Sequence, residues 1–202
     1  MALARVLTFT LDGVESRRVW VEADIRSGLP AFTVVGLADK AVREARERVR
    51  AAIVNSGFEF PFKRITVNLA PASLHKVGPG FDLPLAVAVL VASGQLSGEV
   101  IEGCAVCGEL SLAGEVRPIR GALAIAEGTR RHGLRRLILP LARAREAALV
   151  DSIEVCGAIR SPRWSSSFAA VARRRRFRPN LHAPTRISTW GSISRTFAAT
   201  TR

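Results

Sequence analysis

Hydrophobic and polar residues alternate along the first third of the chain in the manner of β-strands. Short runs rich in β-branched residues are separated by Gly13 and by Gly28-Leu29-Pro30, which is typical of strands joined by turns. A further run follows a longer polar interval. The pattern predicts four strands, over residues 6–11, 19–25, 32–35 and 65–69.

A helical period appears between the third and fourth of these strands. Five apolar residues between Val42 and Ile53 recur at spacings of three and four, which predicts a helix over residues 39–56. Asp39 is a suitable N-cap and Gly57 a suitable stop. On the outer face two i,i+4 ion pairs are expected: Arg43 with Glu47, and Glu44 with Arg48.

The second half alternates between helical and strand-like patterns. Residues 83–92 are apolar all round, so this helix is expected to be covered on more than one side. Strands in a row followed by alternating helices and strands predict an α/β (α+β) domain, with the helices on one side of the sheet. The remaining elements are a hairpin over 105–112 and 115–119, helices over 121–131 and 142–149, and strands over 137–139 and 153–156.

The glycine-rich loop at residues 75–85 is the main candidate for chemistry. It could cradle a phosphate, hold a nucleophile or turn a corner. A phosphate-binding P-loop needs G-x-x-x-x-G-K-[ST], which the sequence lacks, and Pro79 removes one backbone donor. We therefore favour a turn in which Asp82 caps the following helix and Pro84 starts it.

Charge is distributed unevenly. Residues 1–159 carry 20 basic and 17 acidic groups, whereas residues 160–202 contain ten arginines, no lysine and no acidic residue. Such a segment is predicted to be disordered. The run Arg173-Arg174-Arg175-Arg176 could bind nucleic acid or be merely solvated. The composition is also what a GC-rich gene yields in a shifted reading frame, and the sequence leaves these alternatives open.

The three cysteines do not form a disulfide framework, because their number is small and odd. Cys104 and Cys107 have a zinc-like spacing, but a structural site needs four ligands, so buried thiols are expected. No leader is recognisable, and the longest apolar run is too short for a membrane span. These features predict a cytoplasmic protein without a membrane partner.

Several motifs together resemble one known family, the amino-terminal domain of the magnesium-chelatase-like AAA+ proteins of the YifB/ComM type. The resemblance covers residues 1–158, so we expect a Lon-like, ChlI-type domain over 1–158 and a tail over 159–202. The motifs are Ala4-Arg5-Val6, Val21-Glu22-Ala23-Asp24, Gly28-Leu29-Pro30-Ala31-Phe32, Val35-Gly36-Leu37-Ala38-Asp39, Val42-Arg43-Glu44-Ala45-Arg46-Glu47-Arg48-Val49, Asn68-Leu69-Ala70-Pro71-Ala72, Lys76-x-Gly78-x-x-Phe81-Asp82-Leu83-Pro84 and Gly108-Glu109-Leu110-Ser111-Leu112.

The resemblance implies a fold similar to the Lon proteolytic domain and to the second domain of ribosomal protein S-five. In full-length members an AAA+ ATPase module follows, the proteins form hexameric rings, and ComM is associated with DNA branch migration. No Walker A motif is present here, so ATP and Mg²⁺ are expected as cofactors only together with that module. Homo-oligomers and DNA are the partners that the resemblance implies.

The Lon comparison also predicts that this chain is not an enzyme. Lon-type peptidases place a serine after Gly-Pro and a lysine after a Pro-Ile-Gly-Gly turn, where this chain has Gly80 and Leu123. Neither residue can act as a nucleophile or as its base. A contact loop is expected instead, with no catalytic, cofactor-binding or metal-binding residue. Its candidate residues are His75, Lys76, Gly78, Gly80, Phe81, Asp82 and Arg120.

Two other functions stay open at the level of sequence. One is a Lon-type serine peptidase that uses Ser73 with Lys76. The other is a nucleic-acid-binding protein that acts through its arginine-rich tail.

Overall fold

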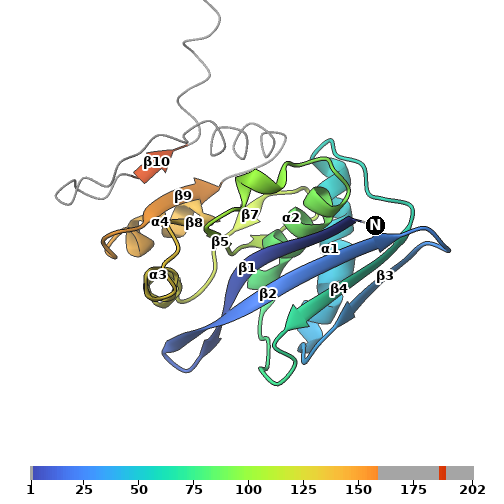
Figure 1. The fold of residues 1–202 in the computed structure, drawn as a ribbon. Coiled ribbons are helices and arrows are strands. Elements are labelled where there is room, and N and C mark those ends of the chain that lie inside the picture. The colour runs from blue at the N-terminus through green and yellow to red at the C-terminus, as the bar shows by residue number, and fades with distance from the viewer. Residues whose placement is uncertain (1, 159–186, 190–202) are drawn as a thin grey trace, which may run out of the picture.

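An eight-stranded mixed sheet organises the chain in the computed structural model, which describes residues 2–158 and 187–189 (Figure 1). The strand order is β10-β9-β8-β5-β1-β2-β4-β3. The strands are β1 (Ala2–Asp12), β2 (Glu15–Arg26), β3 (Ala31–Val35), β4 (Arg64–Ala70), β5 (Cys104–Val106), β8 (Arg136–Pro140), β9 (Glu154–Ala158) and β10 (Ile187–Thr189).

The sheet changes character at β1. On one side β1, β2 and β4 are antiparallel and β3 runs parallel to β4, while on the other side β5, β8, β9 and β10 are all parallel. β1 pairs with β2 along its whole length, from Ala2 opposite Ile25 to Asp12 opposite Glu15. The four strands predicted in the first third of the chain are confirmed.

Helices cover both faces of the sheet, so the expectation of helices on one side is wrong. α1 (Lys40–Asn55) and α2 (Asp82–Ala92) pack on one face, and α3 (Ala122–Arg131) and α4 (Leu141–Ala147) on the other. The reason lies in β1, where Val6 faces the first helix pair and Leu7 and Phe9 face the second. Alternate positions that would face solvent in a one-sided sheet are apolar here.

The predicted ends of α1 are confirmed, but its ion pairs are not. The Asp39 carboxylate accepts a hydrogen bond from the Val42 N–H at 2.8 Å, and Gly57 follows the helix with φ +80°. Arg43 donates to the Ala38 carbonyl and Glu44 lies 3.5 Å from Lys40. Arg48 forms its ion pair with the buried Asp82 and not with Glu44.

The helix α2 is buried on nearly every side, as its apolar sequence predicts. It packs against α1 and against β1 and β2, and a short 3₁₀ helix over Pro79–Phe81 leads into it. A second 3₁₀ helix, Gly98–Val100, follows. The predicted hairpin is only partly confirmed, because its first strand divides between β5 in the main sheet and β6 (Glu109–Leu110), which pairs with β7 (Val116–Arg117).

The tail beyond Ala158 is described only at β10, which pairs in parallel with β9. A strand was not predicted there. The rest of the tail, including the arginine run at residues 173–176, lies outside the described residues. Its predicted disorder therefore stays a prediction. Within the described ranges, no helix has the length and apolar character needed to cross a membrane.

Candidate functional site

The loop at residues 75–85 is fastened to the start of α1 through Asp39. The Asp39 N–H donates to the Lys76 carbonyl at 3.0 Å, and the Lys76 N–H donates to the Leu37 carbonyl at 2.9 Å. One carboxylate oxygen of Asp39 caps α1, while the other accepts from the Gly78 N–H at 2.9 Å. A single side chain therefore orders both the helix start and the loop.

Gly78 and Gly80 have different roles in this loop. Gly78 has φ +87°, a conformation that favours glycine. Gly80 does not have a positive φ, and its carbonyl accepts from the Gly108 N–H at 2.9 Å. A Cβ at Gly80 would lie 3.7 Å from Ile119 Cγ2, an ordinary contact distance. Gly80, which the resemblance assigns to the position of the Lon-type nucleophile, thus has room for a side chain and carries none.

The second position of the Lon-type pair also lacks reactive groups. Leu123 lies at the start of α3 with a half-exposed side chain, and its N–H donates to Glu146 Oε1 at 3.4 Å. A leucine side chain cannot accept a proton from a nucleophile. On the correspondence expected from the sequence, neither Gly80 nor Leu123 offers a nucleophile or a base.

Lys76 is not the exposed contact residue that the sequence analysis expects. Its side chain is fully buried, and Nζ donates a hydrogen bond to the Pro71 carbonyl. Burial lowers the pKa of the Lys76 ammonium because the charged form loses its hydration. His75 and Arg120 are exposed, so of the four charged or titratable contact candidates, which also include Asp82, only these two are on the surface.

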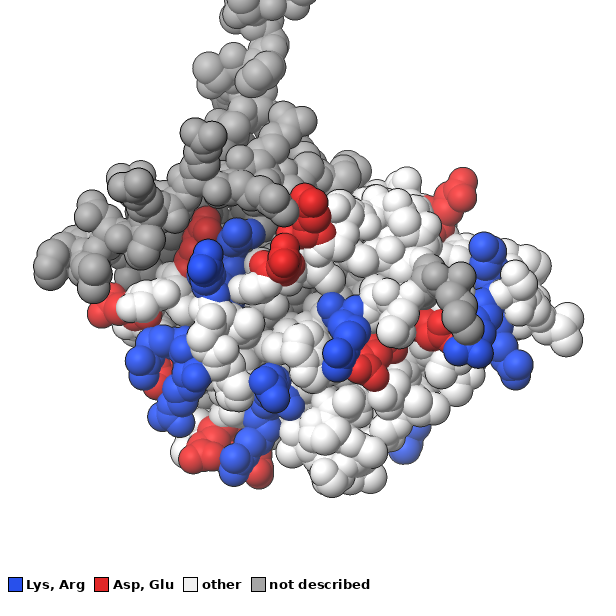
Figure 2. Space-filling view, viewed as in Figure 1, with Lys and Arg blue, Asp and Glu red and all other residues white. Residues whose placement is uncertain are grey.

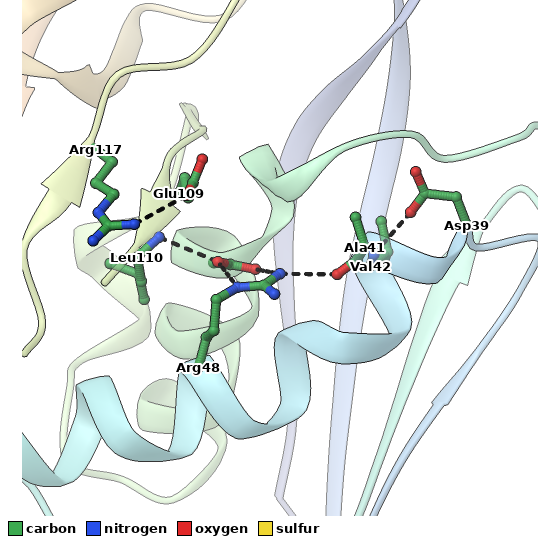
Figure 3. A network of polar contacts seen from close by, with 8 residues as sticks. Asp39, Ala41, Val42, Arg48, Glu109, Leu110 and Arg117 are labelled. Carbon is green, nitrogen blue, oxygen red and sulfur yellow. Dashed lines mark hydrogen bonds and ion pairs between the residues drawn. The ribbon is translucent and has the colours of Figure 1, made fainter. Parts of the chain in front are cut away.

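Asp82 does not cap α2, which corrects a second expectation. Phe81, itself buried, is the N-cap residue and makes no side-chain capping bond. The buried Asp82 carboxylate accepts from Arg48 Nε at 2.7 Å and Nη2 at 3.0 Å, and from the Leu110 N–H at 3.2 Å. Figure 3 shows the Arg48 guanidinium, which extends from α1, at the centre of the network between Ala41 and Leu110. The network ties α1, α2 and β6 together.

The electrostatics of this pair reflect its burial. Loss of hydration raises the pKa of the Asp82 carboxyl, and the hydrogen bond from Arg48 opposes that rise. The same hydrogen bond raises the pKa of Arg48, which also donates to the Ala41 carbonyl at 2.8 Å. A surface ion pair between Glu109 and Arg117, at 3.7 Å, lies beside the network (Figure 3). Asp82 is held as a structural group and is closed to solvent.

Arg48 is the member of this network that the sequence analysis misses. A signal was present, because Arg48 lies three residues after Ala45 and four before Ala52, both on the buried stripe of α1. A residue at this spacing sits beside the stripe, where a long side chain can reach inward. The partner of Arg48, however, is Asp82, which lies 34 residues further along the chain.

Ser73 and Lys76, the alternative peptidase pair, are not joined. Ser73 is exposed, and among the described residues no hydrogen bond links its hydroxyl to the Lys76 ammonium. Ser73 instead lines an open groove of about 670 Å³ between the β1–β2 hairpin and the chain after β4. The lining is Asp12, Arg17, Arg18, Trp20, Ala70, Pro71, Ser73, Leu74 and His132.

The cysteines are buried thiols, as predicted. Cys104 and Cys107 belong to the two opposite cores, and Cys107 Sγ lies 3.2 Å from Thr8 Oγ1. Burial raises the pKa of the Cys104 thiol to about 11. In the part of the chain that the structure describes, no three His, Cys, Asp or Glu side chains gather in a metal-binding group.

Several known proteins have similar sequences. YifB of Salmonella typhimurium is 47% identical over 151 residues, and the competence protein ComM of Haemophilus influenzae is 42% identical over 151 residues. Each match covers 75% of this chain and 30% of the relative, so the chain spans less than a third of their length. A Lon protease of Chloroflexus aurantiacus is 32% identical over 130 residues, which are 60% of this chain and 15% of that protein.

The similarity to a Lon protease agrees with the Lon-like fold expected for residues 1–158. The family described as "Subunit ChlI of Mg-chelatase" matches residues 21–143, which include α1, the loop at 75–85 and the Arg48–Asp82 pair. The chain therefore belongs to the ChlI family of Mg-chelatase subunits.

Proposed function

We propose that this chain is a non-catalytic interaction and assembly domain of a magnesium-chelatase-like AAA+ protein. One observation carries the proposal: at the two positions that the resemblance to Lon-type peptidases assigns to the serine and the lysine, this chain has Gly80 and Leu123. Of the ionisable groups in the loop, Asp82 and Lys76 are buried and engaged with Arg48 and Pro71, respectively, and only His75 is exposed. Because neither of the two positions carries a reactive side chain, we assign this site a role in binding other molecules and not in catalysis.

The matching segment of a competence protein supports a link to DNA handling. In this proposal the domain packs in a ring with further copies and contributes to DNA contacts, in the cytoplasm and with no membrane partner. ATP and Mg²⁺ enter only through an ATPase module outside this domain. His75 and Arg120 are the exposed residues proposed to make the contact, since Lys76 is closed to solvent.

Surface charge argues for local contacts and against a broad basic platform. On the face shown in Figure 2, basic and acidic side chains are intermingled. Residues 1–159 carry 20 basic and 17 acidic groups, so the net charge of this part is small. DNA affinity of the domain is therefore expected to be modest and to depend on a few arginines.

The DNA contact is tested by fluorescence anisotropy with single-stranded and branched oligonucleotides. We expect Arg120→Glu to weaken binding by about threefold to tenfold, because a phosphate contact is replaced by repulsion. Arg135→Glu is the matched control, since Arg135 is equally exposed but its N–H bonds to Gly103, at the start of β5 and away from Gly80. Equal weakening by both variants would show that Arg120 is not a specific contact.

The same assay shows whether the DNA affinity belongs to the domain or to its tail. If residues 159–202 carry the DNA affinity, a chain ending at residue 158 loses it, and the affinity of the full chain falls steeply with salt. Binding by the shortened chain that matches the full chain assigns the contact to the domain.

A fluorophosphonate probe tests the peptidase alternative. The non-catalytic proposal predicts no labelling of the full chain at micromolar probe. Labelling that maps to Ser73 and disappears in Ser73→Ala would overturn it.

A further inference from the structure

Among the residues that the structure describes, the strand β3 forms an edge of the main sheet with no further strand beside it (Figure 1). Natural edge strands are usually protected by lysine, proline, a bulge or a covering loop. The five residues of β3 include no lysine, no proline and no bulge. No charged residue occurs from Gly28 to Ala38. An edge of this kind is a template for pairing with another strand.

The free hydrogen-bonding groups of β3 can be assigned from its register with β4. The Ala31 N–H donates to the Lys63 carbonyl at 3.3 Å, and Ala31 is paired in parallel with Arg64. Since bonding groups alternate in direction along a strand, Ala31, Thr33 and Val35 bond toward β4. The N–H and C=O groups of Phe32 and Val34 therefore point outward.

We propose that this edge pairs with the same edge of a second copy of the chain, antiparallel and with a two-fold axis at Thr33. The sequence is self-complementary in this register. Phe32 of each copy meets Val34 of the other as a hydrogen-bonded pair, and their outward groups satisfy one another. Thr33 meets Thr33, and Ala31 meets Val35, as non-hydrogen-bonded pairs. Every pair joins residues on the same sheet face, and none brings like charges together.

The surroundings of β3 favour the antiparallel arrangement. Leu29 and Phe62, which are 88% and 83% exposed, lie at the beginning of β3, while the part-exposed Val35 and Leu37 lie at its end. Antiparallel pairing places the first apolar pair of one copy beside the second pair of the other. Lys63 and Arg64 also lie at the beginning, so this pairing separates them from their counterparts, whereas a parallel pairing would bring like charges together.

Disruption of the edge tests the proposal by sedimentation equilibrium of the full chain. We expect a dimer whose dissociation constant rises by about tenfold or more in Thr33→Lys, because two positive charges then meet at the axis. Thr66→Lys is the matched control: Thr66 lies beside Thr33 on the neighbouring strand and the same face, but away from the axis. A full chain that is monomeric at about 100 μM, or an assembly that Thr33→Lys leaves unchanged, would overturn the proposal.

A cross-link tests the register itself. Non-hydrogen-bonded partners have Cα atoms about 4.5 Å apart, within the range for a disulfide. Thr33→Cys is expected to form a disulfide-linked dimer on mild oxidation, because the native cysteines are buried. Val14→Cys, at an equally accessible turn, controls for random collision. Equal cross-linking of both variants, or none at residue 33 in a chain that dimerises, would refute pairing at this axis.

Discussion

Two ionisable side chains near the candidate loop are buried with different kinds of partner. Asp82 faces a guanidinium and a backbone N–H, whereas the hydrogen bond found for the Lys76 ammonium is to one backbone carbonyl. A buried charge is tolerated when an opposite charge and hydrogen bonds replace its hydration. Asp82 meets that condition and Lys76 meets it only in part, which makes their expected responses to substitution different.

Removal of the Asp82 charge is expected to destabilise the fold strongly. In Asp82→Asn the Arg48 guanidinium keeps its charge but loses the carboxylate that is paired with it directly, and such losses cost about 3–5 kcal/mol of the free energy of unfolding. Urea denaturation measures the change. Glu127→Gln removes an exposed ion pair with Arg130 and serves as the control, with little expected effect. Similar losses in both variants would contradict a special role for the buried pair.

Lys76 is expected to make stability depend on pH in a defined direction. Burial lowers its pKa below the ordinary value of 10.5, so the unfolded chain binds the proton more readily than the folded chain. The penalty for a charged Lys76 is present at low pH and is relieved as pH rises toward 10.5. The free energy of unfolding of the native chain, relative to that of Lys76→Met, should therefore increase with pH in that window. Parallel pH profiles would contradict this expectation.

The sequence predicts the hydrogen-bond partner of a single residue only where that partner is close in the sequence. Asp39 and Asp82 both precede a helical pattern, and both were predicted to cap a helix. Asp39 does so, because its partner Val42 is three residues away. Asp82 instead accepts hydrogen bonds from Arg48, and the position of Arg48 depends on how α1 packs against α2. No spacing in the sequence reports that packing.

At the scale of the elements, α1 and the candidate loop depend on one another through Asp39. Asp39→Ala removes both the cap and the bond to the Gly78 N–H, with an expected loss of roughly 2–3 kcal/mol in the free energy of unfolding. Asp39→Ser should retain a cap and lose about half as much, since the shorter side chain has one oxygen. Chemical denaturation measures both. Equal losses would show that the cap contributes nothing, and an Asp39→Ser variant as stable as the native chain would show the same of the loop bond.

Alternation and helical period predicted most elements, and the failures share one cause. The strand expected over 105–112 divides because the Cys107 N–H bonds to Ile138 on β8, while the Gly108 N–H turns to Gly80. Both partners are distant in the sequence. The second helix layer was not predicted for a related reason. Leu7 and Phe9 fit an ordinary strand pattern, and only the fold shows that α3 and α4 cover them.

At the scale of the whole molecule, the described hydrophobic cores lie within residues 4–158. We therefore expect a chain ending at residue 158 to unfold in one cooperative transition, with a Tm within a few degrees of the full chain. Loss of β10 removes three strand residues from beside β9 and should have a small effect. Differential scanning calorimetry of both chains measures this. A shortened chain without a cooperative transition would refute the domain boundary.

β1 belongs to both cores at once, with Val6 on one side and Leu7 on the other. Neither helix layer can detach without exposing one face of this strand. Local openings should therefore spread through β1 to the whole molecule, so the two halves act as a single foldon. In native-state hydrogen exchange, the amides of β1 are expected to exchange last, and only through global unfolding.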